Sequence, residues 1–376
     1  MRPGLRIAAF GFRSLPPTDG AAGADKFALE LLPRLAARGN QVIAYNRIYE
    51  GEEEQPRTFR NVQVIPFHTV AGKGFDTLLH SARATWDIIL HNRADVVHIQ
   101  NGGNSIFALF LRIFGKRTYL SQDGIDWARA KWPWYAKIFL RLSSYLTAYV
   151  HNTVIFDNIF AKELFETRFK RRYEFVPFGS DVDYDSSAEV ILDELGLTAG
   201  SYMLFVGRFI PDKGLHYLID AFSRVQTDKK LVLVGGSPNA SGYEKTIRDT
   251  NDTRVVFPGF VYGSSTHALM KNAYAYIQPS DIEGLSPVIL ESAFLGAPII
   301  CSDIEQNQYV MKESAMYFRK SDADDLKRVL ERALLEPEYM RDLGYRGKLR
   351  VTEIFSWDKV TDDHLRIFHG EQLSEI

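Results

Sequence analysis

Short runs of apolar and β-branched residues alternate with longer amphipathic segments along the whole chain of 376 residues. This alternation is typical of parallel sheets whose strands are joined by helical crossovers. Two successive sets of runs predict an α/β protein with two facing Rossmann-like, doubly wound domains and a cleft between them. The expected strands lie at 5–10, 41–45, 62–66, 95–99, 118–121 and 153–156, then at 202–206, 231–234, 255–257, 275–278 and 298–301.

A segment rich in turn-forming and acidic residues, 177–187, separates the two sets. We therefore predict an N-terminal domain over 1–180 and a C-terminal domain over 181–355. The remaining residues, 356–376, read as a helical segment that could return to the N-terminal domain. The chain length suits two domains of this size.

Charge is distributed unevenly between the two halves. Residues 1–180 carry 24 Lys+Arg and 16 Asp+Glu, a net +8, whereas the rest carry 21 and 31, a net −10. This asymmetry indicates halves with different partners, although drift of surface charge is an alternative. The single cysteine, Cys301, excludes an internal disulfide and favours a reducing cytoplasm. We expect no transmembrane helix and no signal peptide, because every apolar run is too short.

The sharpest motif runs from 281 to 292, directly after an expected strand. Ser286 and Pro287 form a helix start, in which a side-chain cap precedes proline at the first helical position. The backbone N–H groups of Leu285, Ser286 and their neighbours would form an anion site at this helix end. Glu283 lies in the preceding loop and Glu291 inside the helix. Two carboxylates beside an anion site suit hydrogen bonds to hydroxyl groups that flank a phosphate, as in a sugar nucleotide.

A second motif, 205–214, also leaves a strand and enters a helix. Gly207 would allow close backbone approach at the strand end. Arg208 and Lys213 would then place two cations at the carboxyl edge of the sheet, where α/β proteins bind ligands. They could neutralise a departing nucleoside diphosphate. A third segment, the Gly/Ala loop at 11–27 that contains Gly23, could approach a phosphate or sugar, and alone it is a weak signal.

These motifs resemble a known family. Val-Gly-Arg-x4-Lys-Gly followed by Glu-x7-Glu is similar to the retaining glycosyltransferases of family 4, which have the GT-B fold. The chain looks closer still to the bacterial rhamnosyltransferase-like branch of polysaccharide and O-antigen assembly. The stretches that carry the likeness are 78–81, 95–98, 123–132, 175–179, 234–236, 258–263 and 283–287.

The resemblance implies a role for each matching residue. Arg208 and Lys213 would hold the donor diphosphate, Glu283 the donor sugar and Glu291 the ribose hydroxyls. Asp123 is a catalytic-site candidate near the donor sugar. The other implied donor-binding residues are Gly23, Gly207, Gly259, Phe260, Val261, Gly284, Leu285 and Ser286. The family transfers the sugar with retention and without a metal, so no cofactor is expected.

Three positions depart from the family pattern. Ala22-Gly23 replaces a Gly-Gly pair, Asp25 replaces a Glu, and Asn307-Gln308-Tyr309 stands where the branch often reads Asn-Arg-Glu. The change at 307–309 removes a charge pair, so the identity of the donor sugar does not follow from the resemblance. The predicted donor is dTDP-L-rhamnose, with a UDP-hexose or UDP-N-acetylhexosamine as the alternative.

The predicted partners are the nucleotide-sugar donor and a glycan or lipid-linked acceptor, without nucleic acid. Segment 127–141 interleaves Trp and Tyr with Lys and Arg, so it could contact the inner face of the cell membrane or pack as an ordinary helix. Two other classes remain as alternatives: a sugar-nucleotide epimerase of the same architecture and a non-catalytic binding protein. The intact Arg/Lys and Glu-x7-Glu sets argue against both.

Overall fold

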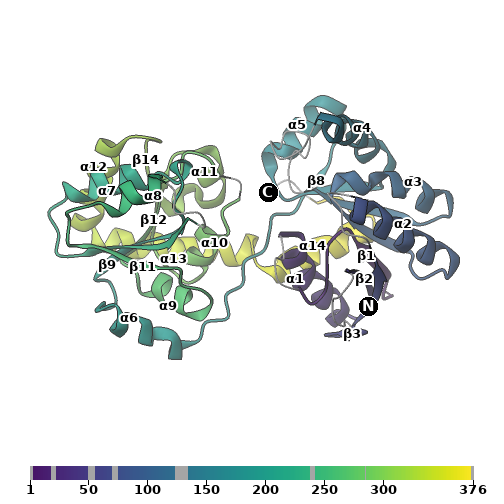
Figure 1. Ribbon diagram of the computed structural model, residues 1–376, viewed down its shortest axis with the longest axis horizontal. Helices are drawn as coiled ribbons and strands as arrows, with labels where there is room; N and C mark the ends of the chain where they lie inside the picture. The colour runs from purple at the N-terminus through teal and green to yellow at the C-terminus, as the bar shows by residue number, and fades with distance from the viewer. Residues whose placement is uncertain are drawn as a thin grey trace. The chain divides into compact units, whose positions relative to one another are not determined.

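The structure is a computed structural model that describes residues 3–17, 23–49, 56–69, 75–122, 134–237, 242–283 and 285–373. The chain divides into two compact units. Unit 1 comprises Met1–Phe178 and Trp357–Ile376, and unit 2 comprises Gly179–Ser356. The C-terminal segment is thus part of the first unit, as Figure 1 shows by its yellow helix α14 beside α1.

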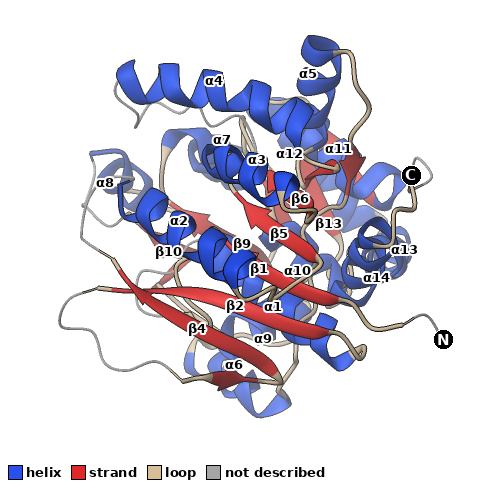
Figure 2. Ribbon diagram, turned by 90° about the vertical axis from the view of Figure 1, so that its right-hand side faces the viewer, coloured by secondary structure: helices blue, strands red, loops and turns tan. Residues whose placement is uncertain are grey.

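Unit 1 is built on one sheet with the strand order β3-β4-β2-β1-β5-β6-β7-β8. Its strands are parallel except for β3, which pairs antiparallel with β4, and the strands β4, β2, β1 and β5 follow one another in Figure 2. Its elements are β1 Arg6–Phe10, α1 Gly23–Ala37, β2 Gln41–Ile48, β3 Thr58–Phe59, β4 Val62–His68, α2 Phe75–Leu90, β5 Val96–Gln100, a 3-10 turn Gly102–Asn104, α3 Ser105–Ile113, β6 Arg117–Gln122, α4 Trp134–Val150, β7 Thr153–Phe156, α5 Ile159–Phe169, β8 Glu174–Phe175 and α14 Trp357–Phe368.

The sheet of unit 1 is covered on both faces because successive side chains of each strand point to opposite sides. In β1, Ile7 and Ala9 pack with α1 and α14, whereas Ala8 and Phe10 pack in the core that contains residues of α2, α3 and α5. All four β1 side chains are fully buried. A run that is apolar at every position therefore forms a central strand.

Helix α14 is held against α1 by an aromatic contact and two ion pairs. Trp357 is buried, with its ring 5.6 Å from that of Phe27 in an edge-on contact. Arg38 donates from Nε to Asp362 Oδ1 at 2.7 Å and from Nη2 to Asp358 Oδ1 at 2.8 Å. These contacts explain why the last segment of the chain belongs to the first unit.

Unit 2 has a sheet of parallel strands in the order β11-β10-β9-β12-β13-β14. Helices α7 and α12 pack on one face, and α9, α10 and α13 on the other. Its elements are a 3-10 turn Ser186–Glu189, α6 Val190–Glu194, β9 Tyr202–Arg208, a 3-10 turn Pro211–Lys213, α7 Leu215–Ser223, β10 Lys230–Gly236, α8 Gly242–Arg248, β11 Val255–Gly259, α9 Ser264–Asn272, β12 Ala275–Gln278, α10 Pro287–Phe294, β13 Ile299–Ser302, α11 Glu305–Met311, a 3-10 turn Lys312–Ser314, β14 Ala315–Phe318, α12 Ala323–Leu335 and α13 Pro337–Ile354.

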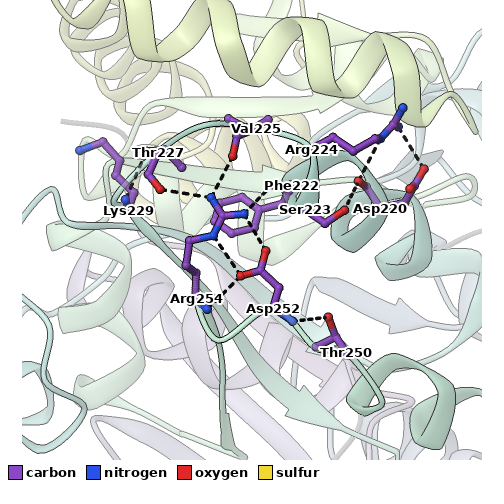
Figure 3. Close-up of polar contacts among 10 residues, drawn as sticks. All are labelled: Asp220, Phe222, Ser223, Arg224, Val225, Thr227, Lys229, Thr250, Asp252 and Arg254. Atoms are coloured by element: carbon purple, nitrogen blue, oxygen red, sulfur yellow. Dashed lines mark hydrogen bonds and ion pairs between the residues drawn. The ribbon is translucent and has the colours of Figure 1, made fainter.

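One arginine ties the end of α7 to the start of β11 (Figure 3). Arg254 donates from Nη1 to the carbonyls of Val225 at 2.8 Å and Thr227 at 3.1 Å, and from Nη2 to that of Phe222 at 3.3 Å. Its guanidinium also pairs with Asp252, Nη2 to Oδ2 at 2.7 Å, and lies over the Phe222 ring. The cluster gives side-chain hydrogen-bond donors to carbonyls at and just beyond the end of α7. It lies at the amino end of β11, the edge opposite the predicted ligand site.

The predicted fold class is confirmed, and every expected strand is present with its bounds shifted by three residues or fewer. Three strands escaped prediction: β3, β8 and β14. β3 and β8 are only two residues long, which is too short for a period to show, whereas β14 is an apolar run as long as the predicted β12 and β13. Within the described residues, no helix is both long enough and apolar enough to cross a membrane.

Candidate functional site

The predicted site residues of unit 2 gather at one edge of its sheet. Strand β9 ends at Arg208, β10 at Gly236 and β12 at Gln278. Because the strands are parallel, these carboxyl ends share an edge. From β9 the chain adds β10 and β11 on one side of the sheet, and then β12, β13 and β14 on the other side. The direction of strand addition therefore reverses between β9 and β12, which is the topological switch point. Ligands of open α/β sheets bind at such points.

A glycine brings together the loops that follow β9 and β12. Gly214 has φ +67°, and a Cβ atom there would lie 2.0 Å from the carbonyl oxygen of Pro279. The Asp281 N–H donates to the Asp212 carbonyl at 2.9 Å. Only a residue without a side chain permits this approach, so Gly214 sets the distance between the loops that carry the charged residues.

Lys213 and Glu283, both predicted from the sequence, form an ion pair between Nζ and Oε1. Their side chains are 18% and 10% exposed, respectively. The pair lies directly after the two strands of the switch point. One Nζ can make three hydrogen bonds and a carboxylate about four, so both groups keep capacity for a ligand.

Gln278, which sequence reasoning did not select, positions Glu283. Its Nε2 donates to Glu283 Oε1 and, at 2.9 Å, to Ser280 Oγ, while its Oε1 accepts from the Tyr276 hydroxyl. Burial, together with the charges of Glu283 and Glu291, raises the pKa of Tyr276 well above its ordinary value. The phenol therefore stays a donor and fixes the orientation of the amide. The sequence signal that could have identified Gln278 is a polar residue at the end of an otherwise apolar strand.

A second buried chain of hydrogen bonds supports the same loop. Ser302, the last residue of β13, donates from Oγ to the Ser280 carbonyl at 2.5 Å. Asn307 donates from Nδ2 to the Ser302 carbonyl at 3.0 Å and to its Oγ at 3.1 Å. The Asn307 side chain, which the sequence marked only as part of a departure from the family pattern, thus anchors the β13 end.

Helix α10 begins as predicted, but its cap differs. Ser286 occupies the N-cap position and Pro287 the first helical position, yet the serine side chain makes no capping hydrogen bond. The prediction of a side-chain cap is therefore wrong. Ser286 is buried, and its carbonyl accepts from Leu290 N. Leu285 is half-buried and packs on the core, whereas Gly284 lies outside the described residues.

Glu291 lies on α10, one turn after Pro287, and is partly buried. Its charge, like that of Glu283, contributes to the raised pKa of Tyr276. Both predicted carboxylates therefore lie within electrostatic range of the same buried phenol.

Arg208 is exposed at the end of β9. Among the described residues, no side chain makes a hydrogen bond or ion pair with its guanidinium, which leaves the group available. The close approach predicted for Gly207 involves Gly235 as well. Gly235 has φ +127°, and a Cβ there would lie 1.9 Å from the Gly207 carbonyl oxygen. Position 235 of β10 therefore requires a residue without a side chain.

The predicted base-contacting segment begins at Gly259, the last residue of β11. Gly259 has φ +82° and open space at its Cβ position, and Phe260 is half exposed. A Cβ on Gly236 would lie 3.1 Å from the Phe260 ring, so this ring rests against the β10 end. The Phe260 and Tyr262 rings are stacked, with centroids 6.0 Å apart. The Val261 carbonyl accepts from Thr266 Oγ1 at 2.7 Å.

The site candidates of unit 1 are less completely described. Gly23 is the exposed first residue of α1. Asp25 is buried, and its Oδ1 accepts from the N–H groups of Arg13 at 2.6 Å and Ser14 at 3.1 Å, so it holds the loop after β1. Asp123 lies outside the described residues, as does 127–133 of the aromatic and basic segment.

No group of three or more His, Cys, Asp or Glu side chains lies close enough to hold a metal ion in the part of the chain that the structure describes.

The architecture is that of the GT-B fold, with two Rossmann-like units. Sucrose-phosphate synthase from Thermosynechococcus elongatus superposes with a TM-score of 0.74 at 20% identity, covering 98% of this chain and 99% of that one. Anabaena HepE in complex with UDP and glucose superposes with a TM-score of 0.73 at 14% identity, covering 97% of this chain and 100% of that one. At these identities the likeness establishes the fold.

The family match lies in unit 2, where residues 193–350 match the family of glycosyl transferases group 1. O-antigen chain mannosyltransferase C of Escherichia coli is 26% identical over 202 residues, 51% of this chain and 53% of that protein. The lipopolysaccharide core biosynthesis glycosyltransferase LpsE of Rhizobium meliloti is 27% identical over 168 residues, 44% of this chain and 48% of that protein. The chain spans about half the length of the curated relatives it matches.

Proposed function

We propose that the protein is a glycosyltransferase that moves a sugar from a nucleotide-sugar donor to a glycan or lipid-linked acceptor in cell-surface polysaccharide or O-antigen synthesis. The observation that carries the proposal is the Lys213–Glu283 pair at the switch point of unit 2, beside the first turn of α10. The match to glycosyl transferases group 1 covers this region. Relatives named for O-antigen and lipopolysaccharide synthesis support the biological setting.

The donor diphosphate would bind among three sources of positive potential. Arg208 is exposed and presents a planar fork, and Lys213 supplies a compact charge. The first N–H groups of α10 add partial positive charge, since the Ser286 side chain does not cap them. These groups would stabilise the charge that develops on the departing nucleoside diphosphate.

The carboxylates would recognise hydroxyl groups. Glu283, oriented by Gln278 and Lys213, would accept a hydrogen bond from the donor sugar, and Glu291 from the ribose. The segment Gly259, Phe260 and Val261 would contact the base. Gly23, Gly207 and Gly284 would permit close approach of the donor, and the backbone N–H groups of Leu285 and Ser286 would bind its phosphate. Asp123 remains a catalytic candidate through the resemblance alone.

We further propose that transfer proceeds with retention through a front-face displacement, in which the leaving phosphate takes the acceptor's proton. Because Arg208 and Lys213 already supply positive charge where the diphosphate would lie, the reaction is proposed to need no metal. The proposed donor is dTDP-L-rhamnose, with a UDP-hexose or UDP-N-acetylhexosamine as the alternative. A sugar-nucleotide epimerase is the less favoured reaction. The proposed location is the cytoplasm, at the inner face of the cell membrane.

Calorimetric titration with UDP, dTDP and GDP and with their sugars tests the donor assignment. Lys213→Ala and Glu283→Gln should each lower turnover by about 100-fold or more, the usual cost of removing one transition-state contact. Lys213→Ala should also weaken binding of the nucleoside diphosphate. EDTA should leave activity unchanged.

Lys229→Ala is the matched control. Lys229 lies at the opposite edge of the same sheet, where its Nζ donates to the Gly200 carbonyl at 2.7 Å and lies over the Tyr274 ring. This variant should bind nucleotide like the unmodified protein. Near-normal turnover in Lys213→Ala or Glu283→Gln would refute the proposed donor site, and activity restored only by a divalent ion would refute the metal-free mechanism.

A further inference from the structure

Helix α4 of unit 1 turns its apolar side chains outward. Trp134, Ile138, Leu142, Tyr145 and Tyr149 recur at helical spacing and are all at least half exposed. The buried face of the same helix carries Ser143, Ser144 and Thr147. An ordinary surface helix buries its apolar stripe and exposes its polar one, so α4 has the reverse arrangement.

The inward polar groups of α4 have hydrogen-bond partners within unit 1. Ser143 donates from Oγ to the Gly102 carbonyl at 2.5 Å, and the Thr147 hydroxyl lies 2.7 Å from that of Ser105. Ser144 donates to the carbonyl of Arg141 at 2.6 Å. The Ser144 bond lies within α4, but those of Ser143 and Thr147 join α4 to its neighbours and fix its rotation, because turning the apolar stripe inward would break them.

Helix α3, which packs against α4 (Figure 1), also exposes apolar side chains. Ile113, the last residue of α3, is 78% exposed. Phe110 extends the surface to α2, since its ring centroid lies 6.1 Å from that of Trp86. The exposed members of the α3 stripe are Ile106, Leu109, Phe110, Ile113 and Phe114. Neighbouring exposed stripes of this kind mark an interaction surface.

The charged residues of α3 and α4 have one sign. The two helices contain no Asp or Glu, whereas they carry three cations, Arg112, Lys137 and Arg141. Two further cations lie over aromatic rings of the α4 stripe: Arg168 over Tyr145 at 5.7 Å and Arg171 over Tyr149 at 5.4 Å. A partner for this surface must therefore be apolar in part and negatively charged.

We infer that the outward faces of α3 and α4 dock on an anionic lipid bilayer. Trp and Tyr favour the interface between headgroups and acyl chains, aliphatic side chains insert below it, and Lys and Arg attract acidic headgroups. A second copy of the chain fits less well, because a symmetric interface would oppose cations to cations. The surface reaches beyond the sequence-predicted segment 127–141 to the whole of α3 and α4. It does not depend on the proposed sugar transfer.

Flotation with vesicles tests the inference on the full chain. The protein should float with vesicles of phosphatidylcholine and phosphatidylglycerol, and more weakly with phosphatidylcholine alone. The double variant Ile113→Glu/Leu142→Glu should lower the partition constant on the order of 100-fold, since both side chains are exposed and would enter the bilayer. Lys137→Gln/Arg141→Gln should lower it on the order of tenfold on the anionic vesicles.

Leu335→Glu is the matched control, because Leu335 is 82% exposed in unit 2. It should float like the unmodified protein, and all variants should keep the same melting temperature. The inference is overturned if the unmodified protein does not float with anionic vesicles, or if Leu335→Glu loses as much binding as the double variant. A dimer in light scattering that dissociates in the double variant, without vesicle binding, would assign the surface to a second copy instead.

Discussion

Replacement of Gly214 by alanine should damage unit 2 in two separable ways. The first is backbone strain, because φ is +67° and a side chain in the left-handed region costs about 1 kcal/mol. The second is a clash, because the new Cβ would lie 2.0 Å from the Pro279 carbonyl oxygen. Relief requires a backbone shift of about 1 Å, and overpacking of this kind costs about 1–3 kcal/mol. The total is about 2–4 kcal/mol.

Gly200→Ala separates the two contributions. Gly200 lies in the same unit and has φ +73°, but no atom lies within 4 Å of its Cβ position. This variant carries the strain without the clash and should cost about 1 kcal/mol. In a domain of this size the melting temperature falls by about 2–4 °C per kcal/mol. We therefore expect a fall of roughly 10 °C for Gly214→Ala and about 3 °C for Gly200→Ala, measured by calorimetry.

The same shift should reach the proposed donor site. Lys213 precedes Gly214, and the neighbouring Asp212 carbonyl accepts the Asp281 N–H at 2.9 Å, a bond that a shift of about 1 Å would break. Gly214→Ala should therefore weaken nucleotide binding, whereas Gly200→Ala should not. Equal melting temperatures for the two variants would refute the reasoning from the close approach. A loss of stability with unchanged nucleotide binding would refute only the link to the site.

Two further predictions concern stability. Arg254→Leu should lower the free energy of unfolding by about 2–3 kcal/mol in urea titration, because it removes three bonds to carbonyls and the ion pair with Asp252. The exposed Arg332→Leu should change it by less than about 1 kcal/mol, and equal effects would contradict this account. Burial lowers the pKa of His80 and His151 to about 3 and of His364 to about 4 from 6.5. The unfolded chain therefore binds more protons than the folded chain below about pH 6.5. The free energy of unfolding should fall by about 3–4 kcal/mol between about pH 6 and about pH 5, and a free energy that does not change with pH would contradict neutral burial of these rings.

Several features of the site were predictable because they are local. Pro287 after Ser286 indicates a helix start whatever the rest of the chain does, and the helix begins there. The positions of Arg208 and Lys213 after a strand likewise follow from the chain itself. The absence of the capping bond was not predictable, because the Ser286 side chain is buried by packing that its neighbours in the sequence do not reveal.

The sequence by itself determined two Rossmann-like units, their strands and the identity of the charged groups, because hydrophobic period and turn chemistry act over a few residues. Tertiary structure alone decided that Lys213 and Glu283, 70 residues apart, form an ion pair, that Gln278 orients the carboxylate and that Gly214 sets the loop spacing. It also decided the rotation of α4, since a helical period is the same whichever face turns inward. Strand order and helix rotation depend on contacts between distant segments, which a local pattern does not contain.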